Sequence, residues 1–141
     1  MDWLLQAKPD DYDIDSALKH KVFEGTWLTP KHQQHIKVGD TALIWRCGPN
    51  AALVATAEIL TLPARIETNP DERKFERRPV KFTGKQWRVR LRMQPLNAPV
   101  SRKTLLDDSV ARKWKVIHGC EGTVFRVPPD VSAAITRIIG S

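Results

Sequence analysis

Residues 41–60, TALIWRCGPNAALVATAEIL, contain the clearest hairpin pattern in the chain. Two apolar runs, at 41–47 and 53–60, flank a loop that contains Gly48-Pro49-Asn50. Apolar runs bounded by turn-forming residues are typical of paired strands. We therefore predict a β-hairpin near the middle of a sheet.

Three further segments have strand patterns. Residues 3–7 are a short apolar run, typical of a buried strand, and residues 122–127 are predicted to be the final strand. Residues 87–93, WRVRLRM, alternate strictly between apolar and basic side chains. Such alternation indicates a half-buried strand with three arginines on its outer face and an apolar inner face: Trp87, Val89, Leu91 and Met93.

Short helices are predicted between these strands. Asp15 is a candidate cap for a helix at 16–21, and Thr29-Pro30 favours a second helix start. This second helix is expected to be short because residues 37–40, KVGD, are typical of a turn. Ser101 is predicted to cap a helix that runs to Asp107.

The rest of the chain completes an α+β pattern. Residues 63–85 hold three prolines and many charges, so we expect a long loop. Another short helix is predicted at 110–116, and a terminal helix at 130–139 that stops at Gly140. We predict one domain over 1–141, with a curved sheet or β-barrel of about five or six strands flanked by short helices.

Length and composition narrow the class of protein. A chain of 141 residues with 41% hydrophobic and 28% charged residues is typical of a soluble globular domain. No apolar stretch approaches the roughly 18 residues of a membrane span. The N-terminus, MDWLLQAKPDDYD, lacks the basic region of a signal peptide, so we expect no membrane partner and a cytoplasmic protein. Cys47 and Cys120 are expected to be reduced, buried thiols.

The positive charge is concentrated in one window. The net charge is +7, and residues 73–92 alone carry +8, so the other 121 residues sum to about −1. A local excess of positive charge favours an anionic partner, with a solvated loop and strand face as the alternative. The predicted phosphate-binding residues are the nine basic ones of this window: Arg73, Lys74, Arg77, Arg78, Lys81, Lys85, Arg88, Arg90 and Arg92.

No motif for metal binding or catalysis stands out. His32 and His35 are three residues apart, but no Cys-x-x-Cys completes a four-ligand zinc site. His118 lies close to Cys120, but no third orienting group or nucleophile elbow accompanies them. Neither a P-loop nor a G-x-G-x-x-G motif is present. We therefore expect no metal, no cofactor and no catalytic activity.

Tryptophan is frequent, with five residues against one tyrosine. Core packing accounts for each ring singly, because an indole buries a large apolar area. Trp27 differs from the others, since it precedes the predicted helix start, where free backbone N–H groups are found. A flat face beside free donors suits a nucleobase, and core packing is the alternative for this residue.

Several stretches together resemble the EVE domain family. They are WLLQAKPDDY from Trp3, TWLTP from Thr26, IKVGD from Ile36, ALIWR from Ala42, LVATAEI from Leu53 and GTVFRVP from Gly122. That family is related to YTH domains and belongs to the PUA-like superfamily. The resemblance spans nearly the whole chain. It implies a PUA-like β-barrel that binds nucleic acid through a pocket for one flipped-out, modified base.

The resemblance also implies site residues. Trp27 is similar to the family's cage tryptophan, and the backbone of Leu28 and Thr29 is the implied contact to the base edge. Lys8 and Tyr12 fall where YTH relatives carry polar base-reading residues. Neither is Asn, and the second cage tryptophan of YTH domains is replaced near Arg92 or Met93. The YTH preference for N6-methyladenine is therefore not carried over.

The base pocket needs a second aromatic wall opposite Trp27, and the candidates for it come from the number of aromatic residues rather than from the family resemblance. The candidates are Trp45, with its neighbour Arg46, and Trp87. Core packing is again the alternative for both rings.

Three functions follow from these features. The first is a non-catalytic module that recognises a modified base in DNA or RNA, since EVE relatives are proposed to recognise bases such as methylated cytosine. The second is an RNA-binding module that reads shape and backbone without a base pocket. The third is a pocket for a free nucleobase or nucleoside.

Overall fold

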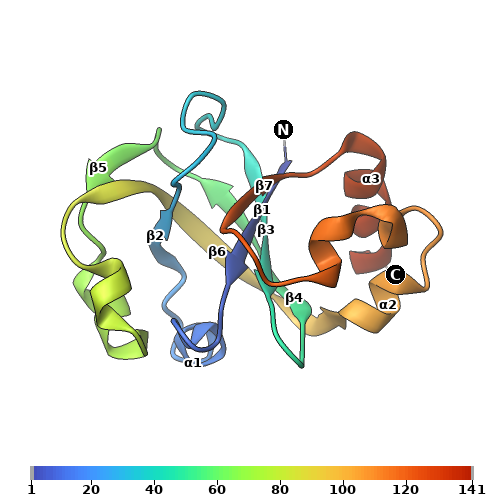
Figure 1. Cartoon of the computed structure of the whole chain (residues 1–141), viewed down its shortest axis with the longest axis horizontal. Helices are drawn as coiled ribbons and strands as arrows, with labels where there is room; N and C mark the ends of the chain where they lie inside the picture. Colours follow the sequence, from blue (N-terminus) through green and yellow to red (C-terminus); the bar gives the residue numbers. More distant parts are fainter. Residues whose placement is uncertain (1, 141) are drawn as a thin grey trace.

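The computed structural model describes residues 2–140 and contains a strongly curved sheet of seven strands (Figure 1). The strand order is β2-β6-β4-β3-β1-β7, and β5 pairs with the start of β6. The strands are β1 (Asp2–Ala7), β2 (Glu24–Leu28), β3 (Thr41–Arg46), β4 (Ala52–Ile59), β5 (Ala64–Ile66), β6 (Gln86–Ser101) and β7 (Val124–Arg126). The α+β class with a curved sheet and short helices is confirmed, although the strands number seven rather than five or six.

The predicted hairpin is the centre of this sheet. β3 and β4 pair antiparallel, with Thr41 opposite Glu58 and Arg46 opposite Ala52. β6 is longer than predicted: residues 86–92 pair with β5 and β2, and β4 pairs with it from Leu91 to Ser101. β1 is parallel to β3. β2 and β7 are the two edges of this order and do not pair with each other, so the curled sheet is a half-barrel with an open seam between β2 and its β1–β7 end.

The helices near the C-terminal part of the chain largely follow the predictions. Ser101 caps α2 (Arg102–Leu106) by accepting a bond from the Thr104 N–H, and α3 spans Pro129–Ile139. Residues 110–116, predicted as a helix, instead form the two short 3-10 helices η3 (Ala111–Lys113) and η4 (Lys115–His118). These elements cover one face of the sheet, on the right-hand side of Figure 1.

The first helix begins earlier than predicted. α1 spans Ile14–Lys19, and its cap is Asp13, which accepts bonds from both the backbone N–H and the hydroxyl of Ser16. The predicted cap, Asp15, lies in the first turn and forms an ion pair with Arg46 at 2.7 Å. Asp13 caps the helix because it directly precedes the first helical residue, Ile14, and from there its carboxylate reaches the free N–H groups of the first turn.

The helix predicted after Thr29-Pro30 is absent, and this prediction was wrong. Residues 30–40 form turns instead. The Thr29 N–H donates to the Trp87 carbonyl at 2.8 Å and so stays bonded to the sheet. His32 has a φ of +64°, in the left-handed region, which an α-helix does not contain.

The strand β2, which contains Trp27, was not predicted. Its five residues pair antiparallel with β6, so that Trp27 lies opposite Val89. The Thr-Pro pair that follows marks the end of this strand rather than the start of a helix. Trp27 therefore stands on a strand and not before a helix.

The apolar core occupies both faces of the sheet. Inside the half-barrel, Trp3, Leu5, Ile44, Leu91 and the Trp27 ring pack together. On the other face, a second cluster joins the sheet to the helices and contains Leu4, Leu43, Trp45, Leu53, Leu105, Ile117, Val131 and Ile135. β1 is buried on both faces, which explains its continuous apolar run.

The two cysteines are joined, which corrects the prediction of separate reduced thiols. Cys47 follows β3 and Cys120 precedes β7, and their Cα atoms are 5.3 Å apart in a disulfide. Their sequence separation of 73 positions hid this proximity. The tertiary fold produces it, since β3 and β7 both pair with β1 and the cysteines lie in the segments just beyond these strands, which meet there.

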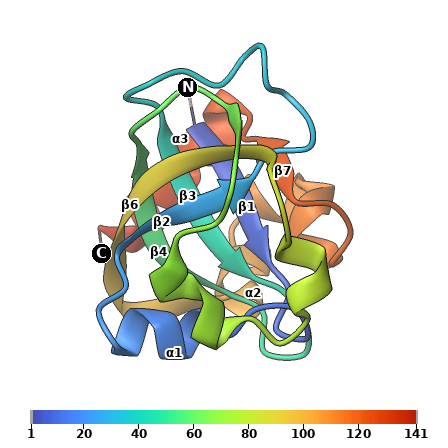
Figure 2. The same ribbon diagram turned by 90° about the vertical axis from the view of Figure 1, so that its left-hand side faces the viewer.

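Residues 67–84, called the cover segment below, close over the free edge of β2 (Figure 2). This segment contains two 3-10 helices, η1 (Pro70–Phe75) and η2 (Pro79–Phe82), within the predicted long loop. The Glu72 carboxylate accepts bonds from the Thr26 N–H at 2.8 Å and the Thr26 hydroxyl at 2.9 Å. Glu72 thus satisfies a backbone donor that an edge strand would otherwise leave unpaired.

Gly25 allows this close approach, and we expect Gly25→Ala to destabilise the fold. An added Cβ would stand 3.1 Å from both Cδ and Oε2 of Glu72, which is itself buried and fixed by hydrogen bonds. We expect a loss of about 1–3 kcal/mol in the free energy of unfolding, as is usual for overpacking, measured by urea denaturation. The control is Gly119→Ala, whose Cβ meets nothing within 4 Å. Equal stability of the two variants would contradict the close contact.

Candidate nucleic-acid interface

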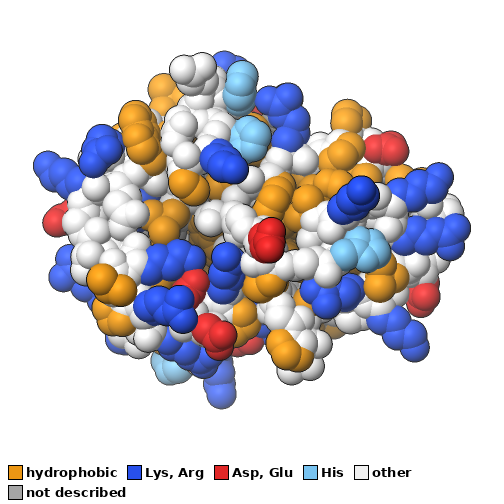
Figure 3. Space-filling view, in the orientation of Figure 1, with side chains coloured by type: hydrophobic (Ala, Val, Ile, Leu, Met, Phe, Trp, Pro, Cys, Tyr) orange, Lys and Arg blue, Asp and Glu red, His pale blue; other side chains and the backbone are white. Residues whose placement is uncertain are grey.

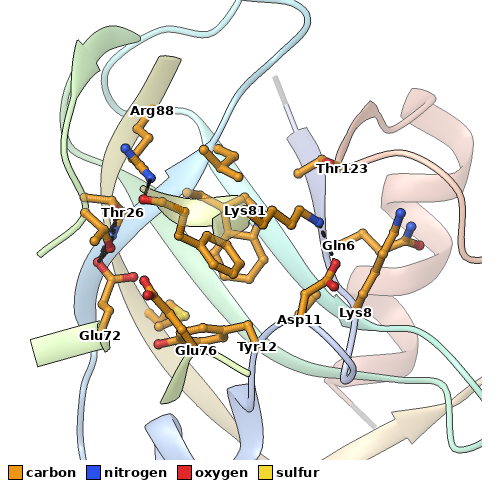
Figure 4. Close-up of a pocket in the computed structure, with 16 residues that line it drawn as sticks. Gln6, Lys8, Asp11, Tyr12, Thr26, Glu72, Glu76, Lys81, Arg88 and Thr123 are labelled. Carbon is orange, nitrogen blue, oxygen red and sulfur yellow. Dashed lines mark hydrogen bonds and ion pairs between the residues drawn. The ribbon is translucent and has the colours of Figure 1, made fainter. Parts of the chain in front are cut away.

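A pocket opens in the seam between β1 and β2, beneath the cover segment (Figure 4). The space open to the centres of water molecules is about 50 Å³, whereas a single water needs roughly 10–15 Å³ on this measure. The pocket therefore has room for a ligand of several water volumes. Its lining residues are Gln6, Ala7, Lys8, Asp11, Tyr12, Thr26, Trp27, Leu28, Thr68, Glu72, Glu76, Lys81, Phe82, Arg88, Met93 and Thr123.

Trp27 contributes one apolar wall. Its position on β2 turns the indole toward the interior of the half-barrel, where it packs with the core and remains 9% exposed. The exposed part belongs to the pocket, so the ring is both a core residue and a wall. The core alternative is therefore confirmed for most of the Trp27 ring, and its role as a stacking face for a base stays a prediction.

Two further aromatic rings line the pocket. Tyr12 follows a turn in which the Tyr12 N–H donates to the Lys8 carbonyl, and it bridges to Glu76 of the cover segment. Its ring meets Phe82 edge to face at a centroid distance of 6.0 Å. Burial, together with Glu72 and Glu76, raises the pKa of Tyr12, so the hydroxyl stays protonated and able to donate.

The backbone of β2 also faces the seam. In the pairing with β6, Thr26 and Leu28 alternate with Gly25 and Trp27, and the Thr26 N–H points away from β6 toward Glu72. Alternation in an antiparallel ladder directs the Leu28 N–H and carbonyl to the same free edge. Leu28 thus presents peptide groups at the pocket, as the family resemblance implies.

Glu72 is an acidic residue buried in the pocket wall. Besides Thr26, its carboxylate accepts bonds from the Asn69 N–H at 3.2 Å and the Thr68 hydroxyl at 3.4 Å. Burial raises the pKa of Glu72 in spite of these bonds. The side chain is therefore a structural tie between the cover segment and β2.

Arg88 was predicted to bind phosphate, and this prediction was wrong because its side chain is buried. Its side chain is 1% exposed and donates to the carbonyls of Ile66 at 2.5 Å, Phe82 at 2.7 Å and Gly84 at 3.0 Å. The sequence places Arg88 on the same strand face as Arg90 and Arg92. The cover segment folds over the first of these three and leaves the other two exposed.

The other basic residues of the window divide into two groups. Five form ion pairs or side-chain hydrogen bonds: Arg77 with Asp13, Arg78 and Lys81 with Asp11, Arg90 with Asn69, and Arg92 with Glu24 and Glu58. The side chains of Arg73, Lys74 and Lys85 lie exposed. Figure 3 shows Lys and Arg side chains gathered at the lower left, over the cover segment.

Two buried acceptors at the pocket have no hydrogen-bond partner in the described structure. They are Oε1 of Gln6 and Oε2 of Glu76. The Gln6 amide is held in place because its Nε2 donates to the carbonyls of Glu121 and Gly122. Buried polar atoms without partners are uncommon in proteins, and a bound donor is one way to satisfy them.

The structure brings together only some of the predicted base-binding residues. Trp27, Leu28, Lys8 and Tyr12 line the pocket, and the buried Thr29 lies directly after Leu28. Trp45 lies on the opposite face of the sheet beneath Arg102, and Arg46 is paired with Asp15. These two residues cannot form a wall of this pocket. Trp87 lines a neighbouring groove instead.

The pocket residues that the cover segment supplies were not predicted. Glu72, Glu76 and Phe82 come from the predicted loop, for which no periodic pattern indicates which side chains turn inward. One local signal was present, since Asn69-Pro70 and Glu72 have the spacing of a capping box, and the Glu72 carboxylate accepts a bond from the Asn69 N–H.

The described part of the chain holds neither a metal cluster nor a spanning helix. In residues 2–140, no three His, Cys, Asp or Glu side chains are grouped to hold a metal ion. Within the same range, no helix has the length and apolar character needed to cross a membrane.

The chain matches a known family over almost its whole length. The family model described as EVE domain matches residues 2–138. No curated protein matches the sequence significantly.

Several solved structures share the fold. Rpa0253 from Rhodopseudomonas palustris has a TM-score of 0.68 and 16% identity, over 99% of this chain and 92% of that one. Human THYN1 in complex with 5-methylcytosine-containing DNA has a TM-score of 0.67 and 10% identity, over 99% and 98%. A mutant of the ZmASCH protein from Zymomonas mobilis has a TM-score of 0.60 and 7% identity, over 97% and 95%. These likenesses confirm the PUA-like fold.

The raised pKa of Glu72 predicts a pH-dependent effect of Glu72→Gln. An acid whose pKa is raised in the folded state favours folding below its unfolded pKa of about 4.3 and loses that contribution as pH rises through the folded pKa. The stability of Glu72→Gln relative to wild type should therefore increase from pH 4 to pH 7. Urea denaturation at several pH values measures it.

Glu67→Gln is the control for this series, since Glu67 is an exposed residue of the same segment. A constant difference between Glu72→Gln and wild type across the pH range would show that burial does not disfavour the Glu72 carboxylate.

Proposed function

The chain belongs to the EVE domain family, and we propose that it is a non-catalytic module that holds one modified base of a nucleic acid in the pocket beside Trp27. The observation that carries this proposal is the combination of three aromatic walls with buried, unpartnered acceptors in one cavity of the described structure. A nucleobase needs both features, because it has a flat apolar face and a polar edge.

The faces of the base would be held by aromatic side chains. Trp27 offers part of its indole, and Tyr12 and Phe82 offer ring edges or faces across the pocket. A methyl group on the base adds apolar surface, for which the Met93 side chain is a further contact. Removal of a methyl group from a fitted pocket costs about 1–3 kcal/mol, which sets the discrimination that such a site achieves.

The edge of the base would be read by groups of fixed position. Oε2 of Glu76 and Oε1 of Gln6 accept hydrogen bonds, and so favour a base with an exocyclic amino group. The Leu28 backbone and the Tyr12 hydroxyl supply further groups at the same cavity. Human THYN1, which has the same fold, was solved with DNA that contains 5-methylcytosine, a base with such an amino group.

The non-catalytic part of the proposal rests on how the acidic residues are used. Asp11 is paired with Lys81 and Arg78, and Glu72 is bonded to Thr26 and Asn69. The carboxylates of Asp11 and Glu72 are therefore committed to the fold rather than poised to move a proton, and the third acid of the pocket, Glu76, is assigned to the edge of the base.

Phosphate contacts would come from the basic residues at and around the pocket. Lys8 and Lys81 line it, while Arg73 and Lys74 lie exposed on η1. Stacking of one base contributes only about 1–3 kcal/mol, so these charges are needed for useful affinity.

We expect Trp27→Leu to reduce binding of an oligonucleotide with a central 5-methylcytosine by about tenfold or more. Leucine keeps the apolar character of the site but removes the stacking face, which contributes about 1–3 kcal/mol. The preference over the unmethylated oligonucleotide should also decrease. Fluorescence anisotropy titrations measure both affinities, and circular dichroism checks the fold.

Trp114→Leu is the matched control, because Trp114 packs in the cluster on the opposite face of the sheet. If Trp27→Leu and Trp114→Leu both bind like wild type, the pocket does not hold the base.

Binding should weaken with added salt, and more steeply in wild type than in the double variant Arg73→Ala/Lys74→Ala. Each phosphate that a basic side chain no longer neutralises lowers the slope of log K against log salt by about 0.7–0.9. Titrations between about 50 and 200 mM salt measure the slope. Lys103→Ala, an exposed change on α2 at the other end of the molecule, is the control. An unchanged slope in the double variant would remove these two residues from the interface.

A further inference from the structure

A second groove lies beside the pocket and contains the exposed tryptophan Trp87. The groove is lined by Leu28, Pro30, Arg65, Lys81, Lys85, Gln86, Trp87 and Thr123. Trp87 is 39% exposed, although it belongs to the apolar side of β6. The ring therefore offers accessible apolar surface within a groove, which is the geometry that a flat partner can stack on.

The exposure of Trp87 follows from its place in the sheet. Val89, Leu91 and Met93 share its strand face and are buried inside the half-barrel. Trp87 stands at the beginning of β6, where the Thr29 N–H makes the last bond from the β2 side. Among the described residues no further strand covers its ring, so its face is left at the mouth of the half-barrel.

Positive charge surrounds this ring. Arg65 lies directly opposite Trp87 in the β5–β6 pair, and Lys85 precedes it by two residues. Residues directly opposite each other in a strand pair stand on the same face of the sheet, and Lys85 lines the same groove as Trp87. Among the described residues that line the groove, none is acidic.

The groove is continuous with the pocket. Leu28, Lys81 and Thr123 line both cavities, so a nucleic-acid strand with one base in the pocket has this groove directly beside it. The Lys81 ammonium is fixed at this junction by Asp11 at 2.7 Å, and the Gln86 amide donates to the Lys81 carbonyl. The junction is therefore preorganised rather than formed by mobile side chains.

We infer that Trp87 is a stacking platform for the unpaired base next to the one in the pocket, and that the ligand is accordingly single-stranded nucleic acid. Arg65 and Lys85 contact the phosphate that joins these two nucleotides. Platforms of this kind combine an aromatic face with flanking cations and tolerate any base. A duplex would keep the neighbouring base paired and stacked within the helix, away from Trp87. The inference rests on the proposed base pocket for the identity of the neighbouring subsite.

The test compares wild type with Trp87→Ala on ligands of two lengths. Wild type should bind a single-stranded pentanucleotide with a central 5-methylcytosine more tightly than it binds the duplex of the same sequence. Trp87→Ala should weaken binding of the single strand by about tenfold. It should leave binding of 5-methyldeoxycytidine monophosphate unchanged, because the mononucleotide occupies the pocket alone.

An abasic site next to the methylated cytosine supplies an internal check. On one of the two sides of the methylated cytosine, the abasic site should weaken binding by wild type about as much as the Trp87→Ala substitution does. It should not weaken binding by Trp87→Ala any further. Trp87→Phe should recover part of the affinity because it restores an aromatic face. Leu62→Ala, a change at another exposed apolar residue, is the control.

The possible contrary results distinguish failure of the Trp87 platform from failure of the proposed modified-base function. If Trp87→Ala binds the single strand like wild type, or if the duplex is preferred, the platform is wrong. If Trp87→Ala weakens the mononucleotide equally, Trp87 belongs to the pocket and the platform is again wrong. If wild type binds methylated and unmethylated strands equally but depends on Trp87, the platform holds and the modified-base function fails. If neither strand binds, both fail.

Discussion

The open seam between β2 and β1 is the constraint on which this structure depends. A sheet that curls without closing leaves an edge strand with backbone groups that need partners. Here the cover segment supplies them, through the Glu72 carboxylate on the Thr26 N–H. Arg88 fastens the same segment by donating to three of the carbonyls along and before it. The cover segment is held in place by its bonds to the edge of β2 and to Arg88.

The candidate site is a consequence of how this seam is covered. The cover segment does not fill the gap completely, so a cavity remains between it and the aromatic residues Trp27 and Tyr12. The carboxylates that fix the segment also line that cavity, which explains why a basic protein has acidic residues in its pocket. Many of its basic residues in turn neutralise local acids, as Arg77 and Arg78 do with Asp13 and Asp11. The net positive charge of a sequence segment therefore overestimates the number of basic side chains that are free to bind phosphate.

Several elements were predictable because their signals are local. The β3–β4 hairpin, the alternating start of β6, the Ser101 cap and the terminal helix each depend on residues that are close in sequence. The errors arose where a distant partner decided the outcome. Thr29-Pro30 has a helix start pattern, yet the bond from Thr29 to Trp87 keeps that segment on the sheet. The Cys47–Cys120 pairing likewise depends on two strands that flank β1.

The sequence by itself determined the α+β class, the family resemblance and the central hairpin, and it named Trp27 and Tyr12 as candidate site residues. Only the tertiary structure separated the tryptophans, by burying Trp45 on the far face, placing Trp27 at the pocket and leaving Trp87 exposed in the next groove. It also decided which basic residues stay accessible and which acids enter the site. The physical reason is that alternation along a strand fixes only which side a residue faces. What covers that side is set by segments that are remote in sequence, such as the cover segment over Arg88.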